Sequence, residues 1–472
     1  MLDPKFIREN PEIVKHATLA KRLASPELVD AWLAADATRR NSQTQFDSLR
    51  NEQKRLGELV GKLKRELKAG TSQELEKLIA EANAIKMQQD ALMADLTAAE
   101  SDCQTIMLQL PAIPDPSWPV GKDERENVVV RTWSDPTHSP LQLDAGRKDH
   151  VTLGKALGII DIERGVKLAG SRSYVLRGLG ARLYWSVLRF AQDFLVARGY
   201  ELMVVPLMVS EQCMIGTGYF PAGRDQTYIT QDGSALVGTS EVPLASFYSD
   251  EIVELERPIK LCALSTCFRR EAGAAGKDTA GLYRVHQFDK VEQVVIHGAD
   301  ETEHIQLHEE IIANAETVLQ ALRLPYRVSM NCTGDMGQGK WRMYDIETWM
   351  PSRKNYGETH SGSALRDFQS RRLNLRYRDK TPNGKGTSRF CYTLNNTAVA
   401  CPRVLISIIE QYQNLDGTVT VPEVLRSYMG NIERITRRIG LQFTSCCLAF
   451  YATPRLRLTS NDVDASARSV SR

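Results

Sequence analysis

The chain has 472 residues, of which 42% are hydrophobic and 25% are charged, as is ordinary for a globular protein of more than one domain. Its net charge of +2 does not indicate nucleic-acid binding, so any basic surface must be local. No run approaches the ~20 apolar residues of a membrane span. The start, MLDPKFIREN, lacks the apolar core of a secretory signal and is too acidic for a typical transit peptide.

The 9 cysteines are scattered along the chain and form no CxxC pair. This pattern is typical of reduced thiols and disfavours a zinc site or a disulfide framework. We therefore expect a cytoplasmic protein.

Residues 27–106 contain no proline and are rich in Ala, Leu, Glu, Lys and Gln. Their apolar positions are spaced alternately by three and four over residues 46–67 and again over residues 75–106, which is the rhythm of a coiled coil. Between the two runs, Gly70 suits a helix C-terminus and Thr71 or Ser72 an N-cap. The sequence predicts two long antiparallel helices joined by a tight turn, and about 40 residues per helix gives an arm of roughly 60 Å.

Cations gather near the tip of the first predicted helix and outnumber the acidic residues Glu52, Glu58 and Glu66. The cations are Arg50, Lys54, Arg55, Lys62, Lys64, Arg65 and Lys68. Such a face can follow a phosphate backbone, but a solvated coiled-coil surface has the same composition. Both interpretations stay open from these residues alone.

Four prolines, at positions 111, 114, 116 and 119, end the helical pattern and predict a domain boundary. We expect a helical arm over residues 1–110, a proline-rich linker over 111–119, a body over 120–435 and an extension over 436–472. The extension is mostly polar except for CCLAFY, and its sequence indicates no function. In the body, residues 183–198 form an amphipathic helical pattern, followed by a predicted strand over 201–205.

A short polar segment, Thr239-Ser240-Glu241, follows an apolar run and precedes Pro243, so we expect it on a loop. A hydroxyl and a carboxylate two positions apart can together hydrogen-bond one small amino acid. An ordinary polar turn is the alternative.

Residues 261–296 predict two strands joined by a Gly-rich loop, with Arg269 and Glu271 where the first strand enters the loop. Alternation along the returning strand places one set of side chains on a common face: Leu282, Arg284, His286, Phe288, Lys290 and Glu292. These groups offer a guanidinium for phosphate, a ring for a flat base and a carboxylate for an ammonium. An amphipathic hairpin with a polar outer face remains the alternative.

The remaining body contains a predicted helix over 305–322 and a strand-like segment, YDIETWMP. Near its end, Asn395 and Thr397 are expected where a strand ends and a helix opens, and Pro402 suits the first helical turn. Arg403 is a cation at the start of an apolar helix, so it requires an anionic partner. That partner is either a carboxylate in a salt bridge or a bound triphosphate.

Several of these segments resemble one known family. FRREAG followed by HQFDKVE resembles motif 2 of class II aminoacyl-tRNA synthetases, specifically the bacterial-type seryl-tRNA synthetases. Residues 239–241 resemble the serine loop of that family, 394–413 resemble motif 3, and 183–205 resemble motif 1, which builds the class II dimer interface. The resemblance runs from Met1 to about Ile435, and the extension and Thr359-His360 depart from it.

The resemblance implies an α+β fold, with an amino-terminal antiparallel coiled-coil arm and an antiparallel sheet flanked by helices. It implies ATP-dependent attachment of serine to serine tRNA, and to selenocysteine tRNA where present, through a seryl-adenylate. The implied partners are serine, ATP with Mg²⁺, serine tRNA bound by the arm, and a second copy of the chain in a homodimer; no membrane and no DNA are implied.

The resemblance also implies site residues. The catalytic pair would be Arg269, which bridges the serine carboxylate and the α-phosphate, and Arg403, which holds the γ-phosphate. ATP-binding positions would be Arg269, Glu271, Val285, Phe288 (under adenine), Glu358, Ser361 and Arg403, with Glu358 and Ser361 also holding Mg²⁺ through hard oxygen atoms. Serine-binding positions would be Thr239, Glu241, Arg269, Glu292, Asn395 and Thr397. The rival hypotheses are a catalytically silent RNA-binding paralogue and a coiled-coil scaffold protein; intact Arg269, Glu292 and Arg403 disfavour the first.

Overall fold

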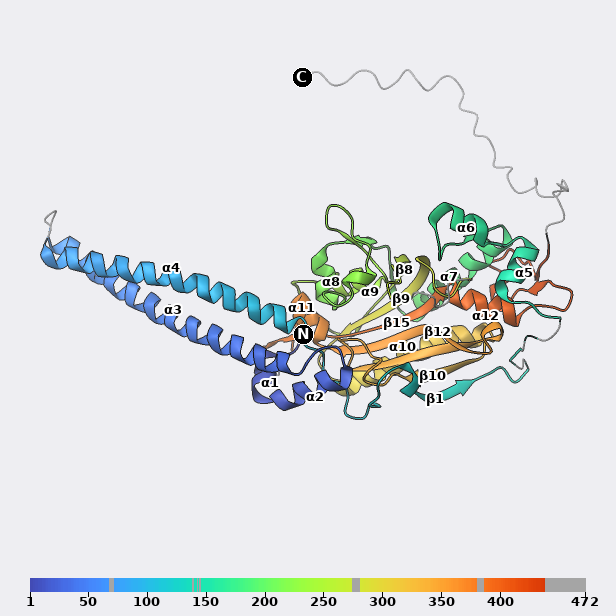
Figure 1. Cartoon of the computed structure of the whole chain (residues 1–472), viewed down its shortest axis with the longest axis horizontal. Coiled ribbons are helices and arrows are strands. Elements are labelled where there is room, and N and C mark those ends of the chain that lie inside the picture. The colour runs from blue at the N-terminus through green and yellow to red at the C-terminus, as the bar shows by residue number, and fades with distance from the viewer. Residues whose placement is uncertain are drawn as a thin grey trace, which may run out of the picture. The chain divides into compact units, whose positions relative to one another are not determined.

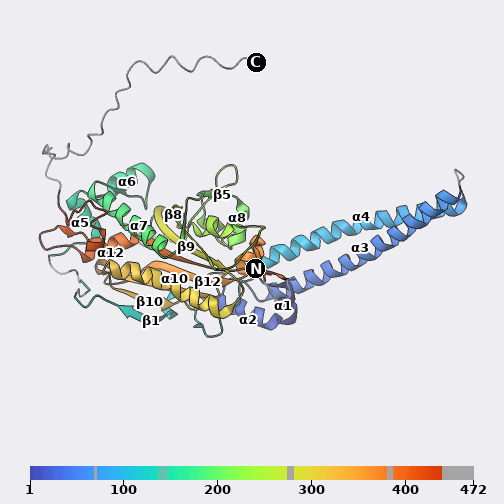
Figure 2. The same ribbon diagram turned by 180° about the vertical axis from the view of Figure 1, so that it is seen from behind.

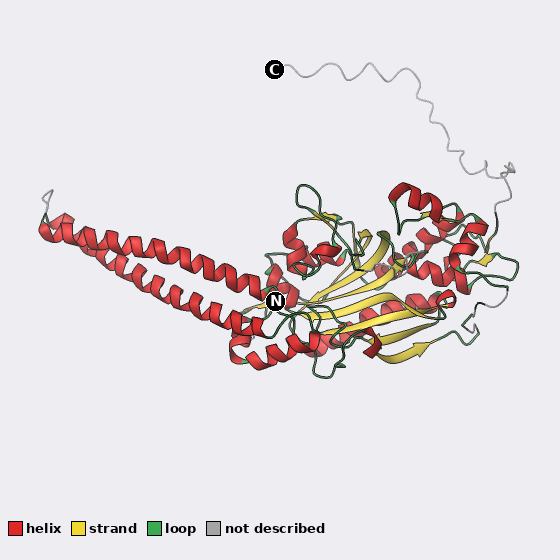
Figure 3. Ribbon diagram, viewed as in Figure 1, coloured by secondary structure: helices red, strands yellow, loops and turns green. Residues whose placement is uncertain are grey.

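A computed structural model of the chain describes residues 1–67, 72–137, 140–141, 143, 146–273, 281–379 and 386–437. Residues 1–436 form one compact unit, built from a helical amino-terminal part and a sheet with flanking helices (Figures 1 and 3). Within the described ranges, no helix has both the length and the apolar character needed to cross a membrane. The predicted extension lies almost entirely outside the described residues.

Two long helices, α3 (Glu27–Glu66) and α4 (Gln73–Met107), pack side by side along their length (Figure 1). The coiled-coil rhythm predicted this arm, and the arm is confirmed. Six positions of the second run are buried, namely Leu75, Ile85, Gln89, Leu96, Ala99 and Cys103, whereas Leu56 is the buried member of the first. The Oγ of Ser72 accepts a hydrogen bond from the backbone N of Leu75 at 3.2 Å and caps α4. Gly70 and Thr71 lie outside the described residues.

The base of the arm contains two short helices, α1 (Pro4–Glu9) and α2 (Pro11–Lys21). They pack on the arm through a small apolar cluster formed by Ile7, Val14, Val29, Trp32, Met107 and Leu110. Apolar side chains from α1, from α2, from the start of α3 and from the end of α4 therefore hold the base of the arm together.

The body is organised around an eight-stranded sheet of order β1-β10-β11-β12-β15-β9-β8-β4. The strands are β1 (Val128–Trp133), β10 (Tyr326–Met330), β11 (Arg342–Met350), β12 (Asn355–Arg366), β15 (Tyr392–Cys401), β9 (Gln287–His297), β8 (Ile259–Phe268) and β4 (Glu201–Met203). Neighbouring strands are antiparallel except β4 and β8, which are parallel. The expected antiparallel sheet therefore has one parallel edge strand, β4.

Eight further α-helices, nine short strands and four short 3-10 helices, at Glu124–Glu126, Arg224–Gln226, Pro351–Arg353 and Glu423–Leu425, complete the described part of the body. The helices are α5 (His150–Leu157), α6 (Ile162–Ala169), α7 (Leu179–Ala197), α8 (Glu211–Thr217), α9 (Glu241–Ser246), α10 (Glu301–Ala321), α11 (Phe368–Leu373) and α12 (Arg403–Gln411). The strands are β2 (Ile160–Asp161), β3 (Val175–Leu176), β5 (Met208–Val209), β6 (Ala235–Leu236), β7 (Ile252–Val253), β13 (Arg376–Arg378), β14 (Ser388–Phe390), β16 (Val419–Thr420) and β17 (Arg434–Ile435).

One face of the sheet is covered by α7, α10 and α12, which together with the strands form the large core (Figures 1 and 2). Alternation along β9 explains which residues reach it. Val291 and Val295 point into this core, so Lys290 and Glu292 lie on the opposite face. That opposite face carries the polar side chains of the site.

A β-bulge interrupts the alternation in β15, where the pairing with β9 skips a residue between Thr397 and Val399. Ala398 and Val399 are consecutive, yet both belong to the large core. Asn395 and Thr397 before the bulge, and Ala400 after it, line the cavity described below.

The structure corrects three local expectations. The returning strand of the predicted hairpin begins at Gln287, so Leu282, Arg284 and His286 precede it; here the backbone N of Leu282 donates to His150 Nε2, and that of His286 donates to the Arg172 carbonyl. Glu241 is the first residue of α9 and not a loop residue. Asn395 and Thr397 lie inside β15 and not at a strand end, because α12 begins only at Arg403.

Candidate active site

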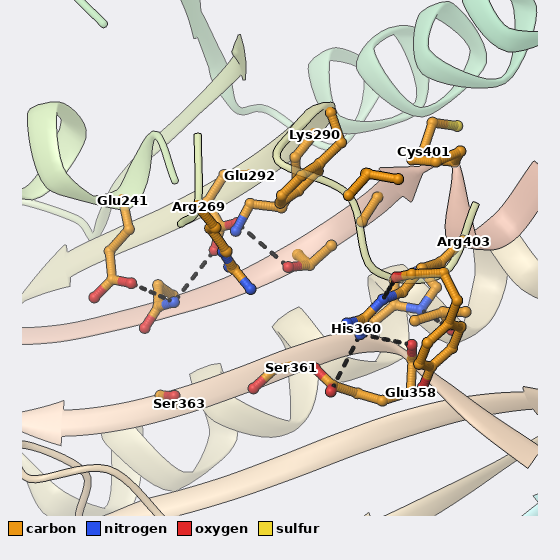
Figure 4. A pocket seen from close by; sticks show the side chains of 18 of the residues that line it. Glu241, Arg269, Lys290, Glu292, Glu358, His360, Ser361, Ser363, Cys401 and Arg403 are labelled. Atoms are coloured by element: carbon orange, nitrogen blue, oxygen red, sulfur yellow. Dashed lines mark hydrogen bonds and ion pairs between the residues drawn. The ribbon is translucent and has the colours of Figure 1, made fainter. Parts of the chain in front are cut away.

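The residues predicted to bind ATP and serine come together around one cavity of about 160 Å³ on the polar face of the sheet (Figure 4). Of the predicted set, the cavity is lined by Glu241, Arg269, Glu271, Val285, Phe288, Glu292, Glu358, Ser361, Asn395, Thr397 and Arg403. Thr239 is not among its lining residues. Its buried hydroxyl instead accepts a hydrogen bond from the backbone N of Glu241 at 3.2 Å, at the start of α9.

One end of the cavity holds two buried carboxylates, Glu241 and Glu292, which are both bonded to Asn395. The Asn395 amide donates to Glu241 Oε2 at 3.0 Å and to Glu292 Oε1 at 3.2 Å. Glu292 is completely buried, and the ammonium of Lys290 lies 2.5 Å from its Oε2. A buried charge is tolerated when it is paired and hydrogen-bonded, and Lys290 and Asn395 provide both conditions.

Glu241 is held by two residues that the sequence did not single out. The Tyr219 hydroxyl donates to its Oε2 at 2.7 Å, and the Gln369 amide donates to its Oε1 at 2.8 Å. Gln369 is in turn oriented by the Thr393 hydroxyl, which donates to its Oε1 at 2.8 Å. These partners come from α11, β15 and the segment after α8, so no local pattern in the sequence could have linked them to Glu241.

Arg269 stands at the end of β8, where the hairpin opens. Its backbone N donates to the His286 carbonyl at 2.9 Å, which keeps the two sides of the hairpin together just beyond the strands. Its guanidinium lies 5.2 Å from the centre of the Phe288 ring and makes long, 3.4 Å hydrogen bonds to the Gly238 carbonyl. No carboxylate is recorded within salt-bridge distance of it in the described part of the chain, so it can accept an anionic ligand.

The other end of the cavity is formed by Arg403 and Glu358 (Figure 4). The guanidinium of Arg403 donates to the carbonyls of Tyr283 and Glu358 and lies 3.2 Å from the Glu358 carboxylate. It also stacks over the Tyr283 ring at 4.4 Å. Partial burial opposes ionisation of Glu358, but the charges of Arg403 and Arg269 outweigh it and lower the pKa of its carboxyl. The predicted anionic partner of Arg403 is thus a carboxylate in the absence of ligand.

The remaining predicted ATP positions lie around the start of the hairpin loop. Glu271 pairs with Arg284 at 3.2 Å, and Val285 is buried beside them. The Phe288 ring is partly exposed at the cavity wall, where a flat base could stack on it.

Glu358 and Ser361 fit a divalent cation because a third oxygen ligand, Asp345, lies beside them. Asp345 pairs directly with Ser361 between β11 and β12, and its Oδ1 is buried. Burial, together with the charge of Glu358, raises the pKa of Asp345 well above its usual value. A divalent cation bound near Asp345 and Glu358 would relieve the repulsion that Glu358 exerts on the Asp345 carboxylate, so these oxygen groups suit Mg²⁺. Asp345 was not predicted from the sequence.

The Thr359-His360 departure is accommodated by a bulge in β12. Glu358 pairs with Glu347 and His360 with Ile346, so Thr359 is the extra residue. Its hydroxyl bonds to the Ile346 carbonyl and to His360 Nδ1. Burial lowers the pKa of His360 to about 4, so the imidazole is neutral at physiological pH. The departure therefore adds no charge near Glu358.

Comparisons with known proteins match both parts of the chain. Residues 1–114 match the family model described as the seryl-tRNA synthetase N-terminal domain, and residues 228–412 match the tRNA synthetase class II core domain (G, H, P, S and T). A serine–tRNA ligase from Deinococcus radiodurans is 41% identical over 92% of this chain and 98% of its own length. One from Methanosarcina barkeri is 39% identical over 93% of this chain and 100% of its own.

Solved structures agree with these matches. The seryl-tRNA synthetase of Pyrococcus horikoshii, complexed with ATP, has a TM-score of 0.83 at 36% identity and covers 93% of this chain and 100% of its own. The cytoplasmic serine–tRNA ligase of Naegleria fowleri, in complex with AMP, has a TM-score of 0.79 at 29% identity over 93% of this chain and 99% of its own. On its sequence, its fold and the groups that line its cavity, the chain belongs to the seryl-tRNA synthetase family of class II aminoacyl-tRNA synthetases.

Proposed function

We propose that this protein is a serine–tRNA ligase that uses ATP to form seryl-adenylate and then transfers the seryl group to serine tRNA. The observation that carries the proposal is the polarity of the cavity. Buried carboxylates at one end suit the ammonium and hydroxyl of serine, and the Arg403 end suits the phosphates of ATP.

The reaction has two steps. An oxygen of the serine carboxylate attacks the α-phosphorus of ATP, a new O–P bond forms, and the α–β P–O bond breaks to release pyrophosphate. A terminal ribose hydroxyl of the tRNA then attacks the carbonyl carbon of the adenylate, and AMP leaves. No side chain must act as nucleophile, so catalysis comes from positioning and charge stabilisation.

Arg269 lies between the two ends of the cavity, which suits contact with both the serine carboxylate and the α-phosphate. Arg403 would bind the γ-phosphate. Its present partner, the Glu358 carboxylate, is half-exposed, so a triphosphate can compete for the guanidinium. Phe288 would stack on adenine, with Glu271 and Val285 as further contacts.

Serine would lie between Glu241 and Glu292. Asn395 and Thr397 complete the pocket, since both already contact these carboxylates. Thr239 would contribute through the start of α9, where it holds the backbone of Glu241.

Mg²⁺ would be held by Glu358 and Ser361, with Asp345 as an additional oxygen ligand. When bound, it would neutralise charge on the phosphates of ATP.

The arm, residues 1–110, would bind serine tRNA through the cations near its tip, and residues 120–435 would carry the chemistry. Arg50, Lys54, Lys62, Lys64 and Arg65 all lie on the described part of α3 and are exposed. We place the protein in the cytoplasm, which is consistent with the unpaired state of the cysteines among the described residues.

The working form would be a homodimer assembled through α7 and β4, the segments that resemble motif 1. Three apolar side chains there are exposed: Trp185, Leu202 and Val204, the last completely. β4 is also an edge strand, with one side free of any partner among the described strands.

Serine-dependent exchange of label between pyrophosphate and ATP tests the first step, and charging of serine tRNA tests the second. We expect both activities, and we expect exchange to stop when serine is omitted. Tight RNA binding without exchange would instead identify a catalytically silent paralogue. The absence of exchange, charging and RNA binding would favour a scaffold protein.

A further inference from the structure

A lysine at the base of the arm is buried in an unusual way. Lys21, the last residue of α2, has no exposed surface, yet its ammonium pairs with no carboxylate recorded among the described residues. Its Nζ donates to three backbone carbonyls, those of Gly337 at 3.2 Å, Gln338 at 3.1 Å and Lys340 at 2.5 Å. An ammonium has three protons, so the three carbonyls match its donors.

The chain that follows α4, also at the base of the arm, bonds to the same segment, residues 337–340. The Gln338 amide donates to the carbonyls of Leu108 at 2.8 Å and Leu110 at 3.3 Å, just after α4. In return, the backbone N of Ala112 donates to the Gln338 carbonyl at 2.9 Å. Residues 337–340 are thus bound by two parts of the arm base, the end of α2 and the segment that follows α4.

This segment forms part of the cavity wall. Lys340 lines the active-site cavity, and so does Met343 three residues later. Met343 pairs with Ser363 in β12, and Ser363 pairs with Asn395 in β15, so the segment borders the end that we assign to serine.

The other side of the segment faces a second cavity of about 700 Å³, next to the base of the arm. Residues 337–340 line it, together with Leu23 and Leu108 from the arm. Two of the four residues are glycines, so the segment has few side chains of its own, although Gly339 packs closely against Phe368. The hydrogen bonds from the arm base therefore add to what keeps the segment in place.

We propose that Lys21 is a positioning residue of the active site, which acts by holding residues 337–340, and with them Lys340, at the serine end of the cavity. In its effect on serine use, the inference rests on the proposed function. The position of the segment itself does not depend on that function and can be measured separately.

Lys21→Met in the full chain is the suitable perturbation. Methionine keeps the length and apolar stem of the side chain and removes all three donors. The three carbonyls hold the ammonium against the effect of burial, which, with a further contribution from the charge of Lys340, lowers the pKa of Lys21 well below its usual value. Replacing a buried charge by an apolar group of similar size is often tolerated by the fold. Lys15→Met, on the same helix, is the matched control because Lys15 pairs with Glu12 and Asp30 and not with this segment.

Two measurements are needed. Hydrogen–deuterium exchange of peptides spanning 337–343 reports the position of the segment without any substrate. We expect faster exchange there in Lys21→Met and no change within β11 at 345–350 or in the control. The kinetics of serine-dependent exchange between pyrophosphate and ATP, with serine and ATP varied separately, report the effect on serine use. We expect kcat/KM for serine to fall about 10- to 100-fold, as for small misplacements elsewhere in enzymes, with the KM for ATP changed less than about twofold.

Two further variants keep the proposal testable if Lys21→Met does not fold. Gln338→Ala removes the hydrogen bonds to the segment that follows α4, and Lys340→Gly removes the side chain that is being positioned. Both should lower kcat/KM for serine, and Lys340→Gly combined with Lys21→Met should cost no more than the more severe single variant.

The outcomes separate the two claims. Unchanged hydrogen exchange at 337–343 in folded Lys21→Met would overturn the positioning role, as would an equal loss for serine and ATP. If Lys21→Met does not fold, unchanged serine kinetics in both Gln338→Ala and Lys340→Gly would overturn it. Faster hydrogen exchange in a protein whose unmodified form shows no serine-dependent exchange would leave the positioning role intact and refute the proposed function.

Discussion

Tyr219→Phe removes one hydroxyl from the group of residues that orients Glu241 and leaves the ring in place. In the structure that hydroxyl donates to Glu241 Oε2 at 2.7 Å, and the carboxylate keeps two other donors, Asn395 and Gln369. A hydrogen bond to a charged group contributes about 1.5–3 kcal/mol. Because two donors remain, we expect the lower end, which corresponds to a loss of roughly tenfold in kcat/KM for serine.

The assay is serine-dependent exchange between pyrophosphate and ATP, with serine and ATP varied in turn. The loss should appear with serine and not in the KM for ATP, since Tyr219 contacts Glu241, which lies at the opposite end of the cavity from Arg403. Burial and the neighbouring Glu241 raise the pKa of Tyr219 well above its usual value, so the hydroxyl stays protonated and donates. The loss should therefore be the same at every pH between about 6 and 9.

Tyr412→Phe is the control for the loss of a partly buried tyrosine hydroxyl. That hydroxyl donates to the Leu322 carbonyl at 2.8 Å, and neither residue lines the cavity, so its removal should lower stability without moving the KM for serine. If folded Tyr219→Phe used serine within twofold of the unmodified protein, the orientation of Glu241 would not depend on Tyr219 and the reasoning would fail.

Four other outcomes are expected. Arg269→Ala should lower exchange by about 10²–10³ or more because it removes a donor to developing negative charge, and near-normal exchange would exclude Arg269 from the mechanism. Alanine should be activated about 10⁴-fold less well than serine, and activation within tenfold would contradict the pocket assignment. Deleting residues 44–100 should spare serine-dependent exchange in folded dimer but sharply reduce charging, and undiminished charging would mean that the tRNA is held elsewhere. The tRNA affinity of the full chain should fall with salt, with a log–log slope of about −0.7 to −0.9 per phosphate neutralised. Burial lowers the pKa of His308 to about 4, so the unfolded chain takes up a proton first as the pH falls below about 6.5, and stability should drop by up to about 3 kcal/mol by pH 4. Thermal unfolding should show a shallower pH dependence in His308→Gln, and an identical dependence would assign the effect to other groups.

The features predicted from sequence were those encoded locally. The arm could be predicted because its apolar repeat is sustained over many turns of helix, and each apolar position falls on the same face of the helix. Strand ends were predicted less well. The hairpin pattern continued back to Leu282, but the backbone N–H groups of Leu282 and His286 donate to His150 and to the Arg172 carbonyl, both more than 110 residues away, and not across the hairpin. Asn395 was expected at the end of a strand because the apolar run after it does not distinguish strand from helix.

The candidate site divides in the same way. The residues expected to touch ligand were found through short motifs, and all but Thr239 line the cavity. The residues that hold them were missed. Tyr219 and Gln369 reach Glu241 from 22 and 128 positions away, and Asp345 meets Ser361 only through the pairing of two strands. Such partners belong to the tertiary structure, and no periodicity in one segment can indicate them.

The bulge at Ala398 divides β15 into two parts, in which side chains of opposite parity face the cavity. Ahead of it the odd-numbered positions face the ligand, at Asn395 and Thr397; beyond it the even-numbered Ala400 does. If Ala398 stayed in the chain but were paired in a regular ladder without the bulge, every strand residue from Val399 onward would turn to the opposite face. Val399 would then face the polar cavity, and Ala400 would enter the core. The serine end and the nucleotide end of the cavity thus share β15, and the one extra residue in the bulge lets side chains on both sides of it line the cavity.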